Sequence, residues 1–245
     1  MSETEVTAEP EPRRRSQRRP WVVGVSGASG TPYAASAIGA LLDAGEAVDL
    51  VVSRAARLTL LDETGIPFRD GHWRADLAAW LGRESDDPAF EAVRYWAAGD
   101  FAAGPSSGSY PAKGMLVIPA STGSVAGITL GLSKDLLQRA AEVNLKERRP
   151  LVVVVRETPL TTATLEQLVS LSRAGAVVLP ASPGFYAGAA VVQQLVDFVA
   201  GKALDALDVR HGLLRRWAGN LGVARVEGVS GTADGHGMEA DVAAE

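Results

Sequence analysis

Residues 21–30 read WVVGVSGASG, and this stretch decides the fold. Its first five residues form a short apolar run of the kind found in buried β-strands. Glycine and serine follow, and the alanine-rich segment 33–42 then predicts a helix. A turn between a strand and a helix N-terminus points backbone N–H groups outward, where they can bind a phosphate. An ordinary strand-to-helix turn, with glycines for tight packing, is the alternative.

The glycine spacing of this turn argues against a dinucleotide ligand. The glycines fall at 24, 27 and 30, which departs from the G-x-G-x-x-G pattern. That pattern also requires an acidic residue at the end of the next strand, where it binds the ribose hydroxyls. The next apolar run, 47–52, ends before Ser53, and its acid, Asp49, lies near its start. We therefore expect the phosphate of a mononucleotide rather than NAD.

Between its two ends the chain alternates apolar runs with helical patterns. The runs are continuously apolar, which is typical of strands covered on both faces of a parallel sheet. We therefore expect a single doubly wound, Rossmann-like α/β domain with a parallel sheet. The expected strands are 21–25, 47–52, 114–118, 151–155 and 176–179, and the expected helices are 33–44, 54–61, 132–146, 164–173 and 190–204.

Residues 62–110 do not fit this alternation. They contain Trp73, Trp80 and Trp96 and a glycine-serine loop at 104–109 that is longer than a typical connection. Long insertions at strand carboxyl ends often contact substrate. A peripheral helical excursion explains the segment equally well, so both interpretations stay open.

The composition excludes several classes of protein. The chain has 245 residues, 47% of them hydrophobic, which is enough for one good-sized core. Its net charge of −5 argues against nucleic-acid binding. The absence of cysteine excludes disulfides and thiolate metal sites and fits a cytoplasmic protein. The three histidines share no helical spacing, so we expect no metal site. Since no apolar run approaches about 20 residues, we expect no membrane span.

Both ends of the chain have the composition of disordered segments. Residues 1–19 and 222–245 are polar and poor in aromatic residues, which leaves 20–221 as the folded domain. Residues 13–19, RRRSQRR, could suggest a twin-arginine export signal. Only five apolar residues follow before the glycine turn, so a solvated basic tail is the better interpretation.

Polar and charged residues are expected at or just after the carboxyl ends of several strands, where open α/β sheets bind ligands. Four segments stand out, 118–124, 145–150, 155–159 and 183–186. Each has an ordinary explanation alone, such as a solvated helix end or a surface ion pair. Together their cations, carboxylate and phenol suit a phosphate ester, because arginine binds its oxygens as a fork and lysine as a point charge. Glu157 could then donate or accept a proton.

The same segments resemble the UbiX-type flavin prenyltransferase family. The resemblance covers about 21–217 and is carried by GVSGASG (24–30), PASTG (119–123), RAAEVNLKERRPLV (139–152), RETPL (156–160), GAVVLP (175–180) and PGFY (183–186). It implies transfer of a dimethylallyl group from dimethylallyl phosphate to N5 and C6 of reduced FMN, without a metal. The product would serve a UbiD-type decarboxylase. The family also implies a homo-oligomer, such as a dodecamer.

The resemblance implies roles for particular residues. Those that would bind FMN are Gly27, Ala28, Ser29, Ser53, Ser121, Thr122, Gly123, Ser124 and Arg139. Those that would bind the prenyl phosphate are Lys146, Arg156, Glu157, Tyr186 and Lys202, with Ser107 and Gly108 reaching across a subunit boundary. Catalysis would involve Ser29 beside the reacting centre, Glu63 near the flavin, and Glu157 as the group that moves a proton.

One position departs from the family pattern. The family usually has an arginine sixteen residues after the tyrosine, and this chain has Lys202 there. The charge is kept, but the bidentate fork is lost. The preference between a monophosphate and a diphosphate donor therefore stays open.

Three other functions are alternatives to prenyl transfer. A flavin-binding decarboxylase of the phosphopantothenoylcysteine type shares the flavoprotein plan, but that chemistry uses a lid cysteine and this chain has none. A non-catalytic flavin-delivery subunit would need neither Glu63 nor Glu157. Direct decarboxylation of aromatic acids is associated with the family, yet no residue in the sequence requires it.

Overall fold

Six parallel strands form one sheet in the computed structural model, which describes residues 19–216. The tails expected at 1–19 and 222–245 lie outside the described residues, apart from Arg19. The strands are β1 (Trp21–Val25), β2 (Val48–Val52), β3 (Val93–Ala97), β4 (Gly114–Ala120), β5 (Leu151–Val155) and β6 (Val177–Pro180). Their order in the sheet is β3-β2-β1-β4-β5-β6. The expected doubly wound α/β fold is confirmed.

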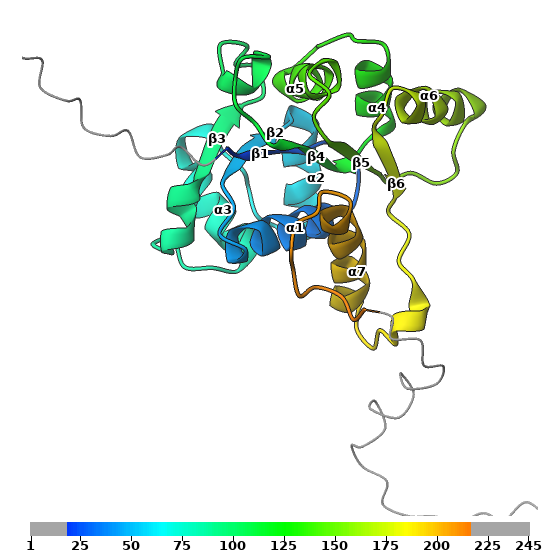
Figure 1. Ribbon diagram of the computed structural model, residues 1–245. Helices are drawn as coiled ribbons and strands as arrows, with labels where there is room; N and C mark the ends of the chain where they lie inside the picture. The colour runs from blue at the N-terminus through cyan, green and yellow to red at the C-terminus, as the bar shows by residue number, and fades with distance from the viewer. Residues whose placement is uncertain (1–18, 217–245) are drawn as a thin grey trace, which may run out of the picture.

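Helices cover both faces of this sheet (Figure 1). The α-helices are α1 (Thr31–Asp43), α2 (Arg54–Thr64), α3 (Trp73–Leu81), α4 (Thr122–Thr129), α5 (Leu136–Lys146), α6 (Thr162–Arg173) and α7 (Val192–Asp205). Side chains of α1, α2, α3 and α7 belong to the core on one face, and those of α4, α5 and α6 to the core on the other. The chain therefore changes faces between β3 and β4, and the strand order reverses where β1 pairs with β4.

The central strands are apolar because both of their faces are covered. Every residue of β1, β2, β4 and β5 is buried. Gly24 shows how closely the layers pack, since a Cβ there would lie 2.9 Å from both Leu137 Cγ on α5 and Met115 Cε. A glycine in β1 thus lets α5 pack directly on the strand.

The structure contains one strand and two α-helices that the sequence did not predict. Strand β3 and helix α3 lie inside 62–110, so that segment supplies the sixth strand as well as an insertion. β3 reads VRYWA and is mostly half-buried, so it lacks the continuous apolar run of a central strand. α4 begins at Thr122, capped by the Ser121 side chain. The helix expected from 132 begins only at Leu136, because the Asp135 side chain caps it there.

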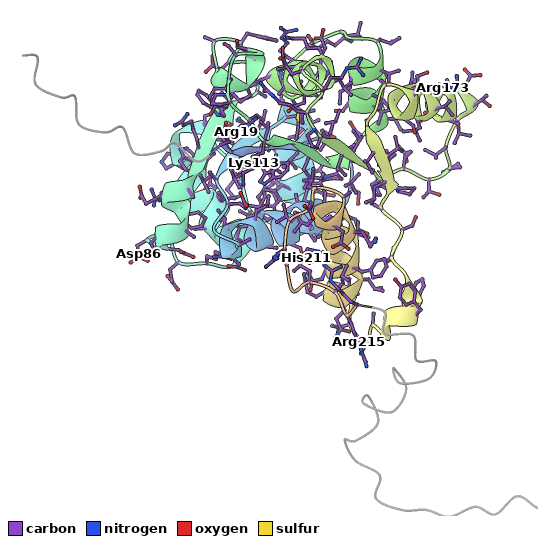
Figure 2. The ribbon with its side chains drawn as sticks, viewed as in Figure 1. Arg19, Asp86, Lys113, Arg173, His211 and Arg215 are labelled. Atoms are coloured by element: carbon purple, nitrogen blue, oxygen red, sulfur yellow. The ribbon has the colours of Figure 1, made fainter. Side chains whose placement is uncertain are left out.

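The residues that precede β1 and β4 bond to each other and mark the amino edge of the sheet, where the strands begin. Arg19 Nη2 donates to the Ala112 carbonyl at 2.8 Å, and the Lys113 amide donates to the Pro20 carbonyl at 2.8 Å. Figure 2 labels Arg19 and Lys113 at this amino edge. The loops that follow the strands lie at the opposite, carboxyl edge. Within residues 19–216, no helix combines the length and the apolar character that crossing a bilayer requires.

Candidate ligand-binding site

A buried serine joins two loops at the point where the strand order reverses. Ser26 Oγ donates to the Pro119 carbonyl at 2.8 Å and accepts from the Ser121 amide at 2.7 Å. The β1–α1 loop and the β4–α4 loop are thereby held together at the carboxyl edge, where ligands bind in this type of fold. Ser26 is not among the residues predicted from the sequence. Its position, a hydroxyl residue directly after a buried strand, is the sequence feature that could have identified it.

Helix α2 packs directly against the glycine turn. A Cβ on Gly27 would overlap the Ala55 side chain, so only glycine allows this approach. The side chain of Ala28 is buried and that of Ser29 is exposed. Gly30 has a φ of +109°, in the left-handed region that favours glycine. The turn is therefore fixed by its glycines and presents Ser29 to solvent.

A carboxylate from α2 caps the helix that follows the turn. Glu63 Oε1 accepts from the Gly30 amide at 2.8 Å, and Glu63 Oε2 accepts from the Thr31 amide at 2.8 Å and from Thr31 Oγ1 at 2.6 Å. The N–H groups expected to face a phosphate at the start of α1 are thus paired within the chain. The sequence did not show this, because Glu63 comes from the next helix and is about thirty residues distant.

The surroundings of Glu63 keep it ionised. Burial raises its pKa, but hydrogen bonds from the Thr31 and Ser29 side chains and from two backbone amides outweigh burial, and the pKa is lowered. Glu63 is therefore a carboxylate at neutral pH. The Ser29 hydroxyl is one of the groups that lower the pKa of Glu63, so these two predicted catalytic residues are neighbours.

Arg156 reaches the same turn from β5. Its amide donates to the Ala120 carbonyl at 3.3 Å, and its Nε donates to the Ser29 carbonyl at 3.0 Å. Its two terminal guanidinium nitrogens form no ion pair within the described part of the chain. Glu157 follows at an exposed position and accepts from the Thr158 amide at 3.0 Å. The structure thus gathers Ser29, Glu63, Arg156 and Glu157 at the carboxyl edge.

The other serines predicted to bind FMN cap helices at this edge. Ser53 Oγ accepts from the Ala56 amide at 3.1 Å at the start of α2. Ser121 Oγ accepts from the Ser124 amide at 3.3 Å and donates to Ser124 Oγ at 3.1 Å at the start of α4. Thr122 and Gly123 form the first turn of α4, and a Cβ on Gly123 would meet no atom within 4 Å. Gly123 therefore borders open space.

A second group of predicted residues lies on α5 and the loop packed against it. Arg139 Nε donates to the Ser106 carbonyl at 3.1 Å. Gly108 packs against the ion pair of Lys146 and Glu147, next to Ser107. Lys146 ends α5 at the amino end of β5, whereas Arg156 follows the carboxyl end of that strand. A strand of this length spans roughly 15 Å, so Lys146 and Arg156 lie at opposite edges of the sheet. The expectation that 145–150 lies at the carboxyl ends of the strands is therefore wrong, because α5 runs back and ends before β5 begins.

Tyr186 and Lys202 form a third group. Tyr186 lies in a 3₁₀ turn at Phe185–Ala187, and its ring makes an edge contact with Phe198 of α7 at 5.7 Å between centroids. Lys202 follows Phe198 by one helical turn, with its Nζ 3.7 Å from Asp205. Figure 1 shows the 3₁₀ turn, in yellow, standing away from the sheet. The structure brings these two residues close to each other along α7.

The ionisable groups near the end of α7 have local partners. His211 is almost fully buried, its Nδ1 accepts from the Leu213 amide at 3.2 Å, and its Nε2 therefore donates to Asp205 at 3.1 Å. Figure 2 labels His211 beside α7.

Among residues 19–216, no three His, Cys, Asp or Glu side chains gather in a way that could hold a metal ion.

The fold and this edge define a class of protein, a doubly wound α/β protein whose strand-end loops present a serine, a carboxylate and an anchored guanidinium. The flavoprotein family profile matches residues 9–204. A flavin prenyltransferase UbiX of Streptomyces coelicolor is 69% identical over 215 residues, covering 85% of this chain and 100% of the relative. A flavin prenyltransferase UbiX of Synechocystis sp. is 42% identical and covers 83% of this chain and 98% of the relative. The chain belongs to the flavoprotein family and, within it, to the UbiX flavin prenyltransferases.

Solved structures agree with this assignment. The crystal structure of AnUbiX (PadA1) in complex with FMN and dimethylallyl pyrophosphate is 36% identical, with a TM-score of 0.71 and coverage of 82% of this chain and 98% of that chain. A dodecameric FMN-dependent Ubix-like decarboxylase from Escherichia coli O157:H7 is also 36% identical, with a TM-score of 0.69 and coverage of 82% and 100%. A phenylacrylic acid decarboxylase from Aquifex aeolicus is 33% identical, with a TM-score of 0.67 and coverage of 79% and 99%.

Proposed function

We propose that this protein is a flavin prenyltransferase that joins the dimethylallyl group of dimethylallyl phosphate to N5 and C6 of reduced FMN. The observation that carries the proposal is the carboxyl-edge constellation of Ser29, Glu63 and Arg156. Breaking the allylic C–O bond leaves negative charge on the departing phosphate. A fixed cation stabilises that charge without having to reorganise.

The anchored guanidinium of Arg156 suits this role. Its Nε–H is used to hold the Ser29 turn, which leaves the other N–H groups directed elsewhere and able to bind phosphate oxygens. Glu157 is the next residue along the chain and is exposed. We assign Glu157 as the group that moves a proton to or from the leaving phosphate. Ionised Glu63 holds the turn in place and contributes negative charge near the flavin.

The residues around the turn fit a flavin. Gly27 allows α2 to approach closely, and Gly123 borders space that a side chain would otherwise fill. Gly27, Ala28, Ser29, Ser53, Ser121, Thr122, Gly123 and Ser124 surround the two joined loops and would hold FMN. When bound and reduced, FMN supplies the nucleophilic N5 and C6 positions that accept the prenyl group.

The remaining predicted residues can act on the same substrate molecule only if two copies of the chain form the site together. Lys146, Ser107 and Gly108 lie at the amino edge, across the sheet from Arg156. We propose that a second copy places these residues, with Arg139, beside the Arg156 and Glu157 of the first. The dodecameric assembly of a relative supports such sharing. Tyr186 and Lys202 would complete the donor site.

The product would leave for another enzyme. Prenylated FMN is a cofactor, and no residue of the described part requires it for a further step of this protein's own. We propose a UbiD-type decarboxylase as its recipient. The donor is either dimethylallyl phosphate or the pyrophosphate that occupies a relative.

The activity can be tested by incubating the full-length protein anaerobically with reduced FMN and each donor. Mass spectrometry then gives the mass of the released flavin. We expect the flavin mass to increase by one five-carbon prenyl unit. Glu157→Gln should slow transfer by about 100-fold or more, because general acid-base catalysis contributes a factor of this size. FMN binding should be retained. Unmodified FMN from the unsubstituted protein would contradict the proposal.

Direct decarboxylation is the second candidate, because two structural relatives carry decarboxylase in their names. The same preparation distinguishes the two functions. Release of carbon dioxide from an aromatic acrylic acid, without a change in flavin mass, would favour decarboxylation. Prenylated flavin without release of carbon dioxide would favour transfer.

A further inference from the structure

Tyr33 lies beside the Ser29 turn and has no role in the function proposed above. It is in the first turn of α1, and its amide donates to the Gly30 carbonyl at 3.0 Å. A Cβ placed on Gly30 would lie 2.7 Å from Tyr33 Cδ2 and 3.8 Å from Arg156 Cγ. The tyrosine ring and the arginine stem therefore approach the same point, on the same side of Gly30.

Both charges of the site act on the Tyr33 phenol. Burial raises its pKa above 10.0, the Arg156 guanidinium lowers it, and the Glu63 carboxylate raises it, with a net increase. The phenol therefore keeps its proton at neutral pH and can donate a hydrogen bond. Within residues 19–216, its hydroxyl has no hydrogen-bond partner.

The rest of the ring explains why the hydroxyl stays in place. Tyr33 is half-buried and packs against the core on the α1 face of the sheet. The ring edge rests on Gly30, where only glycine adopts the required backbone conformation. A polar group that is held by packing, lacks a protein partner and lies close to an anchored arginine is suited to bind an anion.

We propose that Tyr33 is a phosphate-binding residue, whose hydroxyl donates to the phosphate monoester that Arg156 binds. The inference rests on the proposed function, which brings two phosphate monoesters to this edge of the sheet, FMN and dimethylallyl phosphate. Both molecules carry a dianionic phosphate group, whose oxygens can accept hydrogen bonds from the guanidinium and from the phenol. The two arms of the test identify which phosphate is bound.

Tyr33→Phe removes the hydroxyl and keeps the ring. In one arm, FMN is titrated into the full-length protein and its fluorescence is followed. In the other, dimethylallyl phosphate is titrated calorimetrically into the FMN-loaded protein. A hydrogen bond to a charged group predicts about ten-fold weaker binding, or more, in one arm. Weaker binding of FMN would show that Tyr33 contacts the FMN phosphate. Weaker binding of dimethylallyl phosphate would show that it contacts the prenyl phosphate. Two dissociation constants within about two-fold of the unsubstituted protein would overturn the proposal.

Tyr95→Phe is the matched control. The Tyr95 hydroxyl accepts from Arg57 at 2.6 Å and donates to Asp70 at 2.5 Å, and neither partner belongs to the Ser29 turn. We expect this variant to leave both dissociation constants unchanged, even where it lowers stability. Neither titration measures prenyl transfer. A protein that produces no prenylated flavin would refute the proposed function, while the titrations would still decide the role of Tyr33.

Discussion

At the scale of single residues, Glu63 occupies the backbone amides that the glycine turn was expected to offer to a phosphate. The glycine turn suggested a phosphate at the start of α1, but Glu63 accepts from the amides of Gly30 and Thr31. The helix N-terminus is positive, so a carboxylate there is stabilised and is available as a fixed negative charge. The proposed anion binding at this edge is therefore assigned to Arg156, whose Nε donates to the Ser29 carbonyl oxygen.

The ionisation of Glu63 should appear in the pH dependence of stability. Its pKa is lower in the folded protein than its ordinary value of 4.5, so the unfolded chain binds the proton more tightly. The stability that the carboxylate contributes is present above about pH 4.5 and is lost as the pH falls through the lowered folded pKa. Urea unfolding of Glu63→Gln should show a loss of about 1 kcal/mol at pH 7 and a weaker decline below pH 4.5. Equal declines in both proteins would show that Glu63 is not the responsible group.

Lys202 allows a direct test of the donor site. Arginine at this position would restore a bidentate fork for phosphate oxygens. We expect Lys202→Arg to retain prenyl transfer and to bind dimethylallyl phosphate more tightly, by up to about ten-fold. Calorimetric titration of the FMN-loaded protein gives the dissociation constant. Weaker binding would argue that Lys202 does not contact the donor phosphate and serves mainly as a partner of Asp205, 3.7 Å away.

At the scale of elements, the β1–α1 loop depends on close contact with its neighbours. Ser26 ties it to the β4–α4 loop, and Gly27 lets α2 pack against it. These two contacts join three elements that lie far apart in the sequence. They hold the predicted FMN-binding serines at one edge of the sheet.

Gly27→Ala tests this packing. The added methyl group would overlap Ala55, so the turn or α2 must shift. Overpacking of this kind costs about 1–3 kcal/mol, and we also expect weaker FMN binding. Gly123→Ala is the control for stability, because a Cβ there meets no atom within 4 Å. Unfolding curves of the two variants should therefore separate, and coincident curves would show that the turn can adapt at little cost.

β3 and α4, which the sequence did not predict, share a physical cause. β3 carries Arg94, Tyr95 and Trp96, and it is an edge strand whose faces are only partly covered. α4 has eight residues, includes two glycines and is separated from β4 only by Ser121, so no helical period stands out. Where tertiary contacts rather than local pattern stabilise an element, sequence periodicity is a weak guide.

At the scale of the whole molecule, two groups of predicted site residues lie at opposite edges of the sheet. Ser29, Glu63, Arg156 and Glu157 lie at the carboxyl edge of the sheet. Lys146 and its neighbours lie at the amino edge, since α5 returns antiparallel to the strands. A single chain therefore cannot use all of these residues on one substrate molecule, which is the main reason to propose a site shared between copies.

Mixing two inactive variants tests a shared site. Glu157→Gln and Lys146→Ala would each damage every site in a uniform oligomer. After mixed refolding, some sites should combine an intact Glu157 edge with an intact Lys146 edge. We expect prenyl transfer to recover to roughly a quarter of normal in a random mixture of two-copy sites. No recovery, in oligomers shown to contain both variants, would place both residues in the same chain's site.

The sequence alone determined the α/β class, five of the six strands and the residues gathered at the carboxyl edge, because apolar runs and strand-end motifs are local properties of the chain. It also identified the family through motifs in a fixed order. Only the tertiary structure decided that Glu63 caps α1, that Ser26 joins two loops and that Lys146 lies across the sheet from Arg156. Each of these facts depends on how distant elements pack, and packing of distant elements leaves no periodic signal in the sequence.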